Sequence, residues 1–159
     1  MKKYFLIILL FFILDRFTKV YILNLPAGRQ ESHPWGGFFS LQINSQAAFS
    51  LPMTYFLLYP IIVLLIIILL WFWQRDWQRQ SILIWPWALI IIGAISNLMD
   101  RIQYGGVIDF ISVPYFIPRF FLGSATVFNL SDVYISIGVI WILWYQWFFR
   151  KNSFSRSTS

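Results

Sequence analysis

The sequence predicts an all-α integral membrane protein, a bundle of four transmembrane helices capped outside the membrane by a small β-hairpin or loop. Hydrophobic residues make up 59% of the 159 residues and charged residues only 11%, which is more apolar surface than a soluble domain of this size can bury. The apolar residues also fall into four runs near the length of about 20 residues that crosses a bilayer as a helix. We therefore expect a single membrane domain, residues 1–159, with a disordered tail at about 152–159.

The first expected span covers residues 4–25. Two lysines precede its apolar run, as in a signal peptide, but the run is followed by Asp15, Arg16 and Lys19 instead of a small-residue cleavage site. The chain then returns to apolar residues at 20–23. These features predict an uncleaved helix that carries polar residues within its length.

The other three expected spans are residues 55–73, 82–99 and 127–149. The first of these has no charged residue and ends in tryptophans, which favour the membrane interface. A short polar turn is expected at residues 74–81, with Asp76 as a surface charge. The last span ends in tryptophans and a basic pair.

The basic residues predict how the bundle is oriented. Most lie at the N-terminus, in the polar turn and at the C-terminus: Lys2, Lys3, Arg75, Arg79, Arg150, Lys151 and Arg156. The connections at 26–54 and 102–126 carry fewer, chiefly Arg29 and Arg119. By the positive-inside rule both termini are cytoplasmic and these two connections lie outside. Orientation in a bilayer accounts for the formal charge of +6 without a nucleic-acid partner.

The two outer connections have patterns of their own. Residues 39–44 alternate apolar and polar side chains, which predicts a short strand or hairpin. Residues 113–121 are apolar and aromatic, and prolines interrupt them. We expect this second segment to lie along the membrane surface as a loop or short interfacial helix.

Four acidic residues are predicted to converge near the outer leaflet. Asp100 ends the third span, Asp109 follows it, and Asp132 lies a turn or two into the fourth span. Asp15 sits past the middle of the first span. Helices that alternate in direction bring these positions to one level. A carboxylate at membrane depth is costly, so it is usually paired, hydrated or functional.

A pair of such carboxylates has a defined chemistry. Two acids held close cannot both ionise cheaply, so one keeps a proton. The ionised acid activates a water as general base, and the protonated one polarises a carbonyl and protonates the leaving nitrogen. This hydrolysis needs no covalent intermediate, metal or cofactor. The sequence has one histidine, no cysteine and no zinc-binding His-Glu-x-x-His motif.

The polar residues form five ordered boxes. They read Asp15-Arg-Phe-Thr-Lys19, Asn44-Ser-Gln-Ala-Ala-Phe49, Asn97-Leu-Met-Asp-Arg101, Val107-Ile-Asp-Phe110 and Phe128-Asn-Leu-Ser-Asp132. This set resembles the bacterial lipoprotein signal peptidases (signal peptidase II), which are intramembrane aspartic proteases. The resemblance covers essentially the whole chain, including its length and four-span topology.

The resemblance implies a role for each matching residue. Asp109 and Asp132 would be the catalytic pair. The other matching positions would shape the site or bind substrate: Asp15, Lys19, Asn44, Asn97, Asp100, Arg101 and Asn129. Three positions depart from the family's pattern, with Gln46 and Ser96 in place of glycine and Ser131 in place of alanine.

The resemblance also implies the substrate and the location. The chain would remove signal peptides from diacylglyceryl-modified prolipoproteins, cutting on the N-terminal side of the lipidated cysteine. It would be a multi-pass protein of the bacterial cytoplasmic (inner) membrane, with its active site toward the extracytoplasmic face. Its partners would be these signal peptides and membrane lipid, and globomycin-like cyclic peptides would inhibit it.

Structural alternatives remain open for the same residues. Asp109 and Asp132 could cap helices or pair with an arginine, and Asp100 could pair with a base at its helix end. Asp15 and Lys19 have the spacing of an intrahelical salt bridge. The asparagines of the boxes could be ordinary interhelical hydrogen-bonding residues.

Two functions of other classes also remain open. A proton- or cation-coupled carrier would use carboxylates at membrane depth, but it needs polar residues toward both faces. The cytoplasmic halves of the second to fourth spans are nearly all apolar. A non-enzymatic membrane assembly factor would tolerate neutralisation of Asp109 or Asp132.

Overall fold

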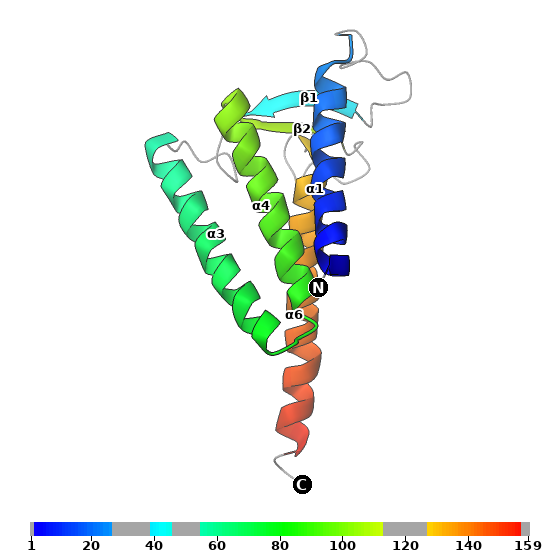
Figure 1. Cartoon of the computed structure of the whole chain (residues 1–159), viewed down its shortest axis with the longest axis vertical. Coiled ribbons are helices and arrows are strands. Elements are labelled where there is room, and N and C mark those ends of the chain that lie inside the picture. Colours follow the sequence, from blue (N-terminus) through cyan, green and yellow to red (C-terminus); the bar gives the residue numbers. More distant parts are fainter. Residues whose placement is uncertain (1, 27–38, 46–54, 113–126, 157–159) are drawn as a thin grey trace, which may run out of the picture.

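The computed structural model describes residues 2–26, 39–45, 55–112 and 127–156. In these residues the chain is mostly helical, with one small antiparallel sheet. The elements in chain order are α1 (Lys2–Leu23), β1 (Phe39–Asn44), α3 (Tyr55–Gln78), α4 (Ile84–Tyr104), β2 (Val107–Ser112), β3 (Val127–Phe128) and α6 (Leu130–Arg156). The helices alternate in direction, with the sheet at one end of the bundle (Figure 1). The start of α1 and the end of α6 point away from the sheet.

Helix α4 is the centre of the bundle, since it packs against α6, α3 and α1. Two glycines allow α4 and α6 to approach closely. A Cβ atom at Gly93 would lie 2.6 Å from the carbonyl oxygen of Ser131, and one at Gly138 would lie 2.7 Å from that of Pro86. Small residues serve this purpose in membrane bundles. As a result the first turn of α6 lies directly against the half of α4 nearest the sheet.

Polar and apolar side chains are distributed as expected for a protein in lipid. Among the described residues, the largest fully buried side chains include those of Lys19, Asn129, Asp15 and Asp100. Leucine, isoleucine and aromatic side chains on α1, α3 and α6 are instead widely exposed. Exposed apolar faces of this extent require a membrane or a partner to cover them.

Two helical segments, Leu57–Gln78 and Leu130–Phe149, are long and apolar enough to cross a membrane by length and composition. Helices α1 and α4 carry charged residues in their halves nearest the sheet, so apolar length alone does not identify them. The predicted number of four spans and the cytoplasmic side of both termini stay predictions.

The sheet joins three segments that are far apart in the chain. Its strand order is β1-β2-β3, and both pairings are antiparallel. Gln42 pairs with Asp109, and Ile111 pairs with Phe128. The predicted strand at 39–44 is confirmed, but its partner is β2 and not the second arm of a hairpin. Because β2 begins with four buried residues, it lacks the period-two pattern that would have indicated a strand.

Two consecutive glycines lead the chain from α4 into β2. Gly105 adopts a left-handed conformation with φ 73°, and its N–H donates to the carbonyl of Arg101 at 3.0 Å. Such a residue ends a helix without steric cost when it is glycine. A Cβ atom at Gly106 would lie 2.9 Å from the carbonyl oxygen of Asn44. The pair thus ends α4 and lets β1 lie close against β2.

The polar turn after the second span is shorter than predicted. Helix α3 continues to Gln78, and the prediction that Asp76 is a surface charge is wrong because this side chain is buried. Its carboxylate accepts a hydrogen bond from the Trp87 indole at 2.7 Å and pairs with Arg75 at 3.3 Å. Partners on α3 and α4 therefore compensate the buried charge and tie the two helices together.

The last helix differs from its predicted bounds at both ends. It begins at Leu130 and not at 127, because Val127 and Phe128 form β3. It continues to Arg156, beyond the predicted end at 149, and the disorder of the tail stays a prediction. No glycine or proline follows Gly138 to stop the helix. The expected surface segment at 113–121, like Gln46, lies outside the described residues.

Candidate active site

Asp109 lies in β2 at the sheet end of the bundle and is 4% exposed. Its carboxylate accepts hydrogen bonds from two side-chain amides. Asn129 Nδ2 donates to Oδ1 at 2.7 Å, and Asn44 Nδ2 donates to Oδ2 at 3.3 Å. The strand pairing explains the second contact, since Asn44 ends β1 beside β2. Asp109 is therefore held from two sides by groups distant in sequence.

Asp132 lies in the first turn of α6, where it takes part in starting the helix. Its backbone N–H donates to Asn129 Oδ1 at 3.0 Å, and the backbone N–H of Asn129 donates to Asp132 Oδ2 at 3.2 Å. This reciprocal pair has the form of a capping box. The other carboxylate oxygen, Oδ1, accepts from Asn97 Nδ2 at 2.9 Å. The Asn-Leu-Ser-Asp spacing thus has a structural role of its own.

Burial, followed by the negative charge of Asp132, raises the pKa of Asp109 to about 6. The hydrogen bonds from Asn129 and Asn44 and the positive charge of Lys19 act in the opposite direction. Desolvation outweighs them because the ionised carboxylate loses its water. A carboxyl group in this range can hold or release a proton near neutral pH, as acid–base catalysis requires.

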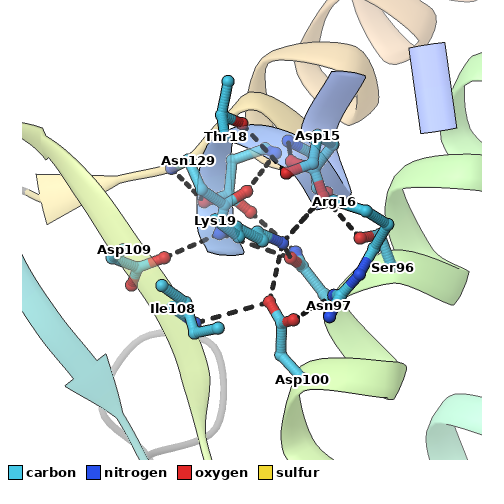
Figure 2. A network of polar contacts seen from close by, with 12 residues as sticks. Asp15, Arg16, Thr18, Lys19, Ser96, Asn97, Asp100, Ile108, Asp109 and Asn129 are labelled. Atoms are coloured by element: carbon cyan, nitrogen blue, oxygen red, sulfur yellow. Dashed lines mark hydrogen bonds and ion pairs between the residues drawn. The ribbon is translucent and has the colours of Figure 1, made fainter. Parts of the chain in front are cut away.

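A second polar cluster lies beside these two acids and centres on the buried ammonium group of Lys19. This group pairs with Asp15 at 3.0 Å and with Asp100 at 2.7 Å. Arg16 also pairs with Asp100. Figure 2 shows the cluster, in which side chains of α1 meet those of α4. The salt bridge that the spacing of Asp15 and Lys19 allows is present. Asp100 is paired as well, but with Arg16 and Lys19 of α1 and not with a base at its own helix end.

The remaining oxygens of the cluster are also occupied. Asp15 accepts a hydrogen bond from the Ser131 backbone N–H at 2.9 Å and another from the Ser96 hydroxyl. Asp100 accepts the backbone N–H of Ile108 at 3.4 Å. The cluster therefore connects α1 and α4 to the start of α6 and to β2.

Asn97 links the two groups of acids. It donates to Asp132, and its Oδ1 atom accepts from Lys19 Nζ at 3.2 Å and from Asn129 Nδ2 at 3.3 Å. The predicted convergence of the four acids is thus present as one connected network. Their depth relative to a membrane stays a prediction.

Arg101 follows Asp100 near the C-terminal end of α4. Its positive charge interacts favourably with Asp109, Asp132 and Asp100. Its carbonyl accepts the Tyr59 hydroxyl of α3 at 3.0 Å. All of the residues predicted for the site thus lie at the sheet end of the bundle. Among the described residues, no group of three or more acidic or histidine side chains is arranged to hold a metal ion.

Sequence reasoning did not single out Arg16 as a site residue, and it treated Ser96 and Ser131 only as departures from a pattern. Arg16 was indicated by its place inside the first box. The two serines carry polar contacts: the Ser96 hydroxyl donates to Asp15, and Ser131 Oγ accepts from Lys19 Nζ at 3.3 Å. In the sequence, the only sign of this role is that each serine directly precedes a residue predicted for the site, Asn97 and Asp132 respectively.

Comparison with known proteins gives a consistent result. The profile of the family described as signal peptidase (SPase) II matches residues 7–148. A lipoprotein signal peptidase of Bartonella henselae is 35% identical over 150 residues, covering 89% of this chain and 88% of the relative. One from Pelodictyon phaeoclathratiforme is 33% identical over 152 residues, covering 90% and 89%. One from Streptococcus pneumoniae is 31% identical over 142 residues, covering 86% and 87%.

Solved structures give the same result for the fold. A structure described as a bacterial membrane enzyme superposes with a TM-score of 0.78 at 26% identity, covering 96% of this chain and 92% of that one. A second, described in the same words, gives a TM-score of 0.72 at 27% identity, with coverage of 90% and 91%. With the family profile spanning most of its length and close to a third of its residues shared with these relatives, the chain belongs to the signal peptidase II family of proteases.

Proposed function

We propose that the chain is an aspartic endopeptidase with Asp109 and Asp132 as its catalytic pair. The observation that carries this proposal is the position of Asn129 between them. Its Nδ2 atom donates to Asp109, and its Oδ1 atom accepts the backbone N–H of Asp132. A single buried side chain thereby holds both acids at one site, as a shared water and a shared peptide bond require.

The surroundings of the two acids suit different roles. Asp132 accepts hydrogen bonds from the Asn97 amide and the Asn129 backbone N–H, which hold both of its oxygens in place at the start of α6. Burial raises the pKa of Asp109 to about 6, which brings its protonated form within reach near neutral pH. Asp132 would therefore take a proton from the attacking water as general base. Asp109 would polarise the scissile carbonyl and give its proton to the leaving nitrogen.

The proposed substrates are prolipoproteins that carry a diacylglyceryl-modified cysteine, cut on the N-terminal side of that cysteine. The relatives named above as lipoprotein signal peptidases support this substrate class. A site at the outer ends of apolar helices suits a signal peptide that lies in the bilayer. On the same basis we propose inhibition by globomycin-like cyclic peptides.

We further propose that the site faces the extracytoplasmic side of the bacterial cytoplasmic membrane, with both termini cytoplasmic. The supporting observation is that the ends of α1 and α6 near the termini, where basic residues gather, point away from the sheet and the acids (Figure 1). Basic residues are enriched on the cytoplasmic side of membrane proteins.

The carrier alternative has less support. A cavity of about 350 Å³ lies between α1, α4 and α6, and its lining is apolar and aromatic, including Phe11, Ile92, Tyr134 and Trp141. This lining offers no chain of ionisable groups from the acids toward the opposite end of the bundle. Proton and ion carriers need such a relay.

Cleavage of a diacylglyceryl-modified prolipoprotein by purified protein tests the proposal, with Asp109→Asn and Asp132→Asn as variants. Each substitution keeps an oxygen acceptor for the neighbouring asparagine, so folding should be preserved. We expect kcat to fall by at least about 100-fold in each, as for loss of a general acid or base. Near wild-type cleavage by either folded variant would disprove the aspartic mechanism.

A further inference from the structure

The amide group of Asn97 is placed between a cation and a carboxylate. Its oxygen accepts hydrogen bonds from Lys19 Nζ at 3.2 Å and Asn129 Nδ2 at 3.3 Å. Its nitrogen donates to Asp132 Oδ1 at 2.9 Å. These contacts use both ends of the amide, and each end has a partner of the opposite hydrogen-bonding type.

Rotation of the amide by half a turn would reverse these matches. The NH₂ group would then face the Lys19 ammonium, which has donors and no acceptor. The amide oxygen would face the Asp132 carboxylate, which has acceptors and no donor when ionised. A cation on one side of Asn97 therefore selects the orientation that presents a donor to the acid on the other side.

Lys19 is buried and has no N–H donor left for a substrate. Its side chain is 0% exposed. Its ammonium group is surrounded by acceptors from Asp15, Asp100, Asn97 and Ser131. An ammonium group has only three N–H donors, so these four acceptors already share all of them.

The cluster also balances its own charge. Asp15 and Asp100 carry the negative charges, while Lys19 and Arg16 carry the positive ones. A buried cation without such partners would be strongly unfavourable. The two carboxylates therefore act as the holders of the ammonium group, and they fix the position from which it reaches Asn97.

We propose that Lys19 is a positioning residue that acts on catalysis through Asn97. It sets the orientation of the Asn97 amide, and the amide presents its N–H to Asp132. The proposal rests on the proposed function, in which Asp132 is the general base. It assigns Lys19 no contact with the substrate or the reacting atoms.

A double-mutant cycle of Lys19→Met and Asn97→Leu tests this coupling, with cleavage of a diacylglyceryl-modified prolipoprotein as the assay. We expect each single variant to lower kcat by about ten-fold or more, with KM changed by less than about two-fold. In the Asn97→Leu background, Lys19→Met should lower kcat by less than about two-fold further. The proposal would be overturned if the loss of kcat in the double variant equalled the product of the two single losses. It would also be overturned if the single variants raised KM and left kcat unchanged.

Arg16→Gln is the matched control. Arg16 also pairs with Asp100, but within the described residues its other hydrogen bond goes to Gln103 Oε1 at 3.1 Å and not to Asn97. Any effect of Arg16→Gln on kcat should therefore multiply with that of Asn97→Leu. If Arg16 and Lys19 behave alike in the cycle, the effect belongs to the charge cluster in general and the proposed path through Asn97 is wrong.

A charge-balanced variant covers the case in which Lys19→Met does not fold. Asp15→Asn combined with Lys19→Met removes one charge of each sign, so no lone buried charge remains from this pair. The folded double variant should still show the loss of kcat. Near wild-type kcat in that protein would overturn the proposal. Failure of the proposed function would be distinct, because it would appear as cleavage by Asp132→Asn.

Discussion

The Nδ2 atom of Asn129 lies 2.7 Å from the Oδ1 atom of Asp109 and donates a hydrogen bond to it. The carbonyl oxygen of the same amide accepts the backbone N–H of Asp132 at 3.0 Å and so caps α6. Asn129 therefore has two tasks, which are to hold one acid and to start the helix that carries the other. The two tasks can be separated by substitution.

Asn129→Ser should separate capping from catalysis. A serine hydroxyl can still accept the N–H of Asp132 as an N-cap, but it cannot reach Asp109 with an amide donor. We expect Asn129→Ala to lower the free energy of unfolding by about 1 kcal/mol more than Asn129→Ser does, because both lose the amide donor to Asp109 and only serine keeps the cap. Both should lower kcat strongly. Thermal unfolding and cleavage assays on the two variants measure this, and recovery of activity in Asn129→Ser would contradict the role given to the amide.

The activity should depend on pH through Asp109. Burial and Asp132 raise the pKa of this group to about 6, and the proposed mechanism needs its protonated form. We therefore expect kcat/KM, which reports the free enzyme, to fall as the pH rises through about 6. Initial rates at low substrate concentration across a pH series provide the measurement. A kcat/KM that increases through this range would mean that Asp109 acts in its ionised form.

Stability should depend on pH through the same group. The pKa of an aspartate is 3.8 in the reference state and about 6 for Asp109 in the fold. Its contribution to the free energy of unfolding is therefore full below the lower value and is lost as the pH rises through the higher one.

Asp109→Asn removes this titration and makes the effect measurable. The melting temperature of the variant relative to wild type should increase by a few degrees between those pH values. Because the comparison uses the change with pH, a constant difference from altered hydrogen bonds does not affect it. A difference in melting temperature that is flat with pH would exclude the raised pKa.

Gly93 and Gly138 offer a matched pair on the α4–α6 interface. An added Cβ would meet a carbonyl oxygen of the facing helix at 2.6 Å for Gly93 and at 2.7 Å for Gly138. We expect alanine at either position to lower the free energy of unfolding by about 1–3 kcal/mol. Only Gly93→Ala moves Ser131, which is next to Asp132, so only this variant should also lower kcat. If Gly93→Ala and Gly138→Ala had equal kcat values when the same fraction of each was folded, the specific effect of Gly93 on Asp132 would be contradicted.

Trp87→Phe tests the contact that ties α3 to α4 at the end away from the sheet. Phe72 and Trp87 stack with centroids 5.2 Å apart, and a phenylalanine ring can keep this packing. The variant loses the 2.7 Å hydrogen bond to buried Asp76. We expect a loss of about 1–3 kcal/mol in the free energy of unfolding with kcat unchanged. Activity lost in proportion to stability would contradict the independence of the two ends.

Some parts of the site could be predicted from the sequence because their signals are local. The i, i+4 spacing of Asp15 and Lys19 predicts their salt bridge, and alternation at 39–44 predicts a strand. Both are present. The convergence of the acids followed from alternating helix directions, which needs only span lengths and the order of the polar residues.

The parts that could not be predicted depend on partners far apart in the chain. Asp76 was taken for a surface charge because the sequence around it is polar, whereas its burial depends on Trp87 of the next helix. The pairing of β1 with β2 joins segments that have helices α3 and α4 between them in the chain. Neither segment carries a turn signal that would specify the other. The contact between Lys19 and Asn97 likewise depends on how α1 packs against α4.

In the proposed mechanism, the capping box of Asn129 and Asp132 also determines when activity can begin during synthesis. Lys19, Asn97 and Asp109 precede it in the chain, and the box forms only when α6 begins. Until that helix has left the ribosome and entered the bilayer, Asp109 lacks both its Asn129 donor and its partner acid. In the proposed mechanism a nascent chain without this helix is therefore inert, and peptidase activity begins only when α6 has packed against α4.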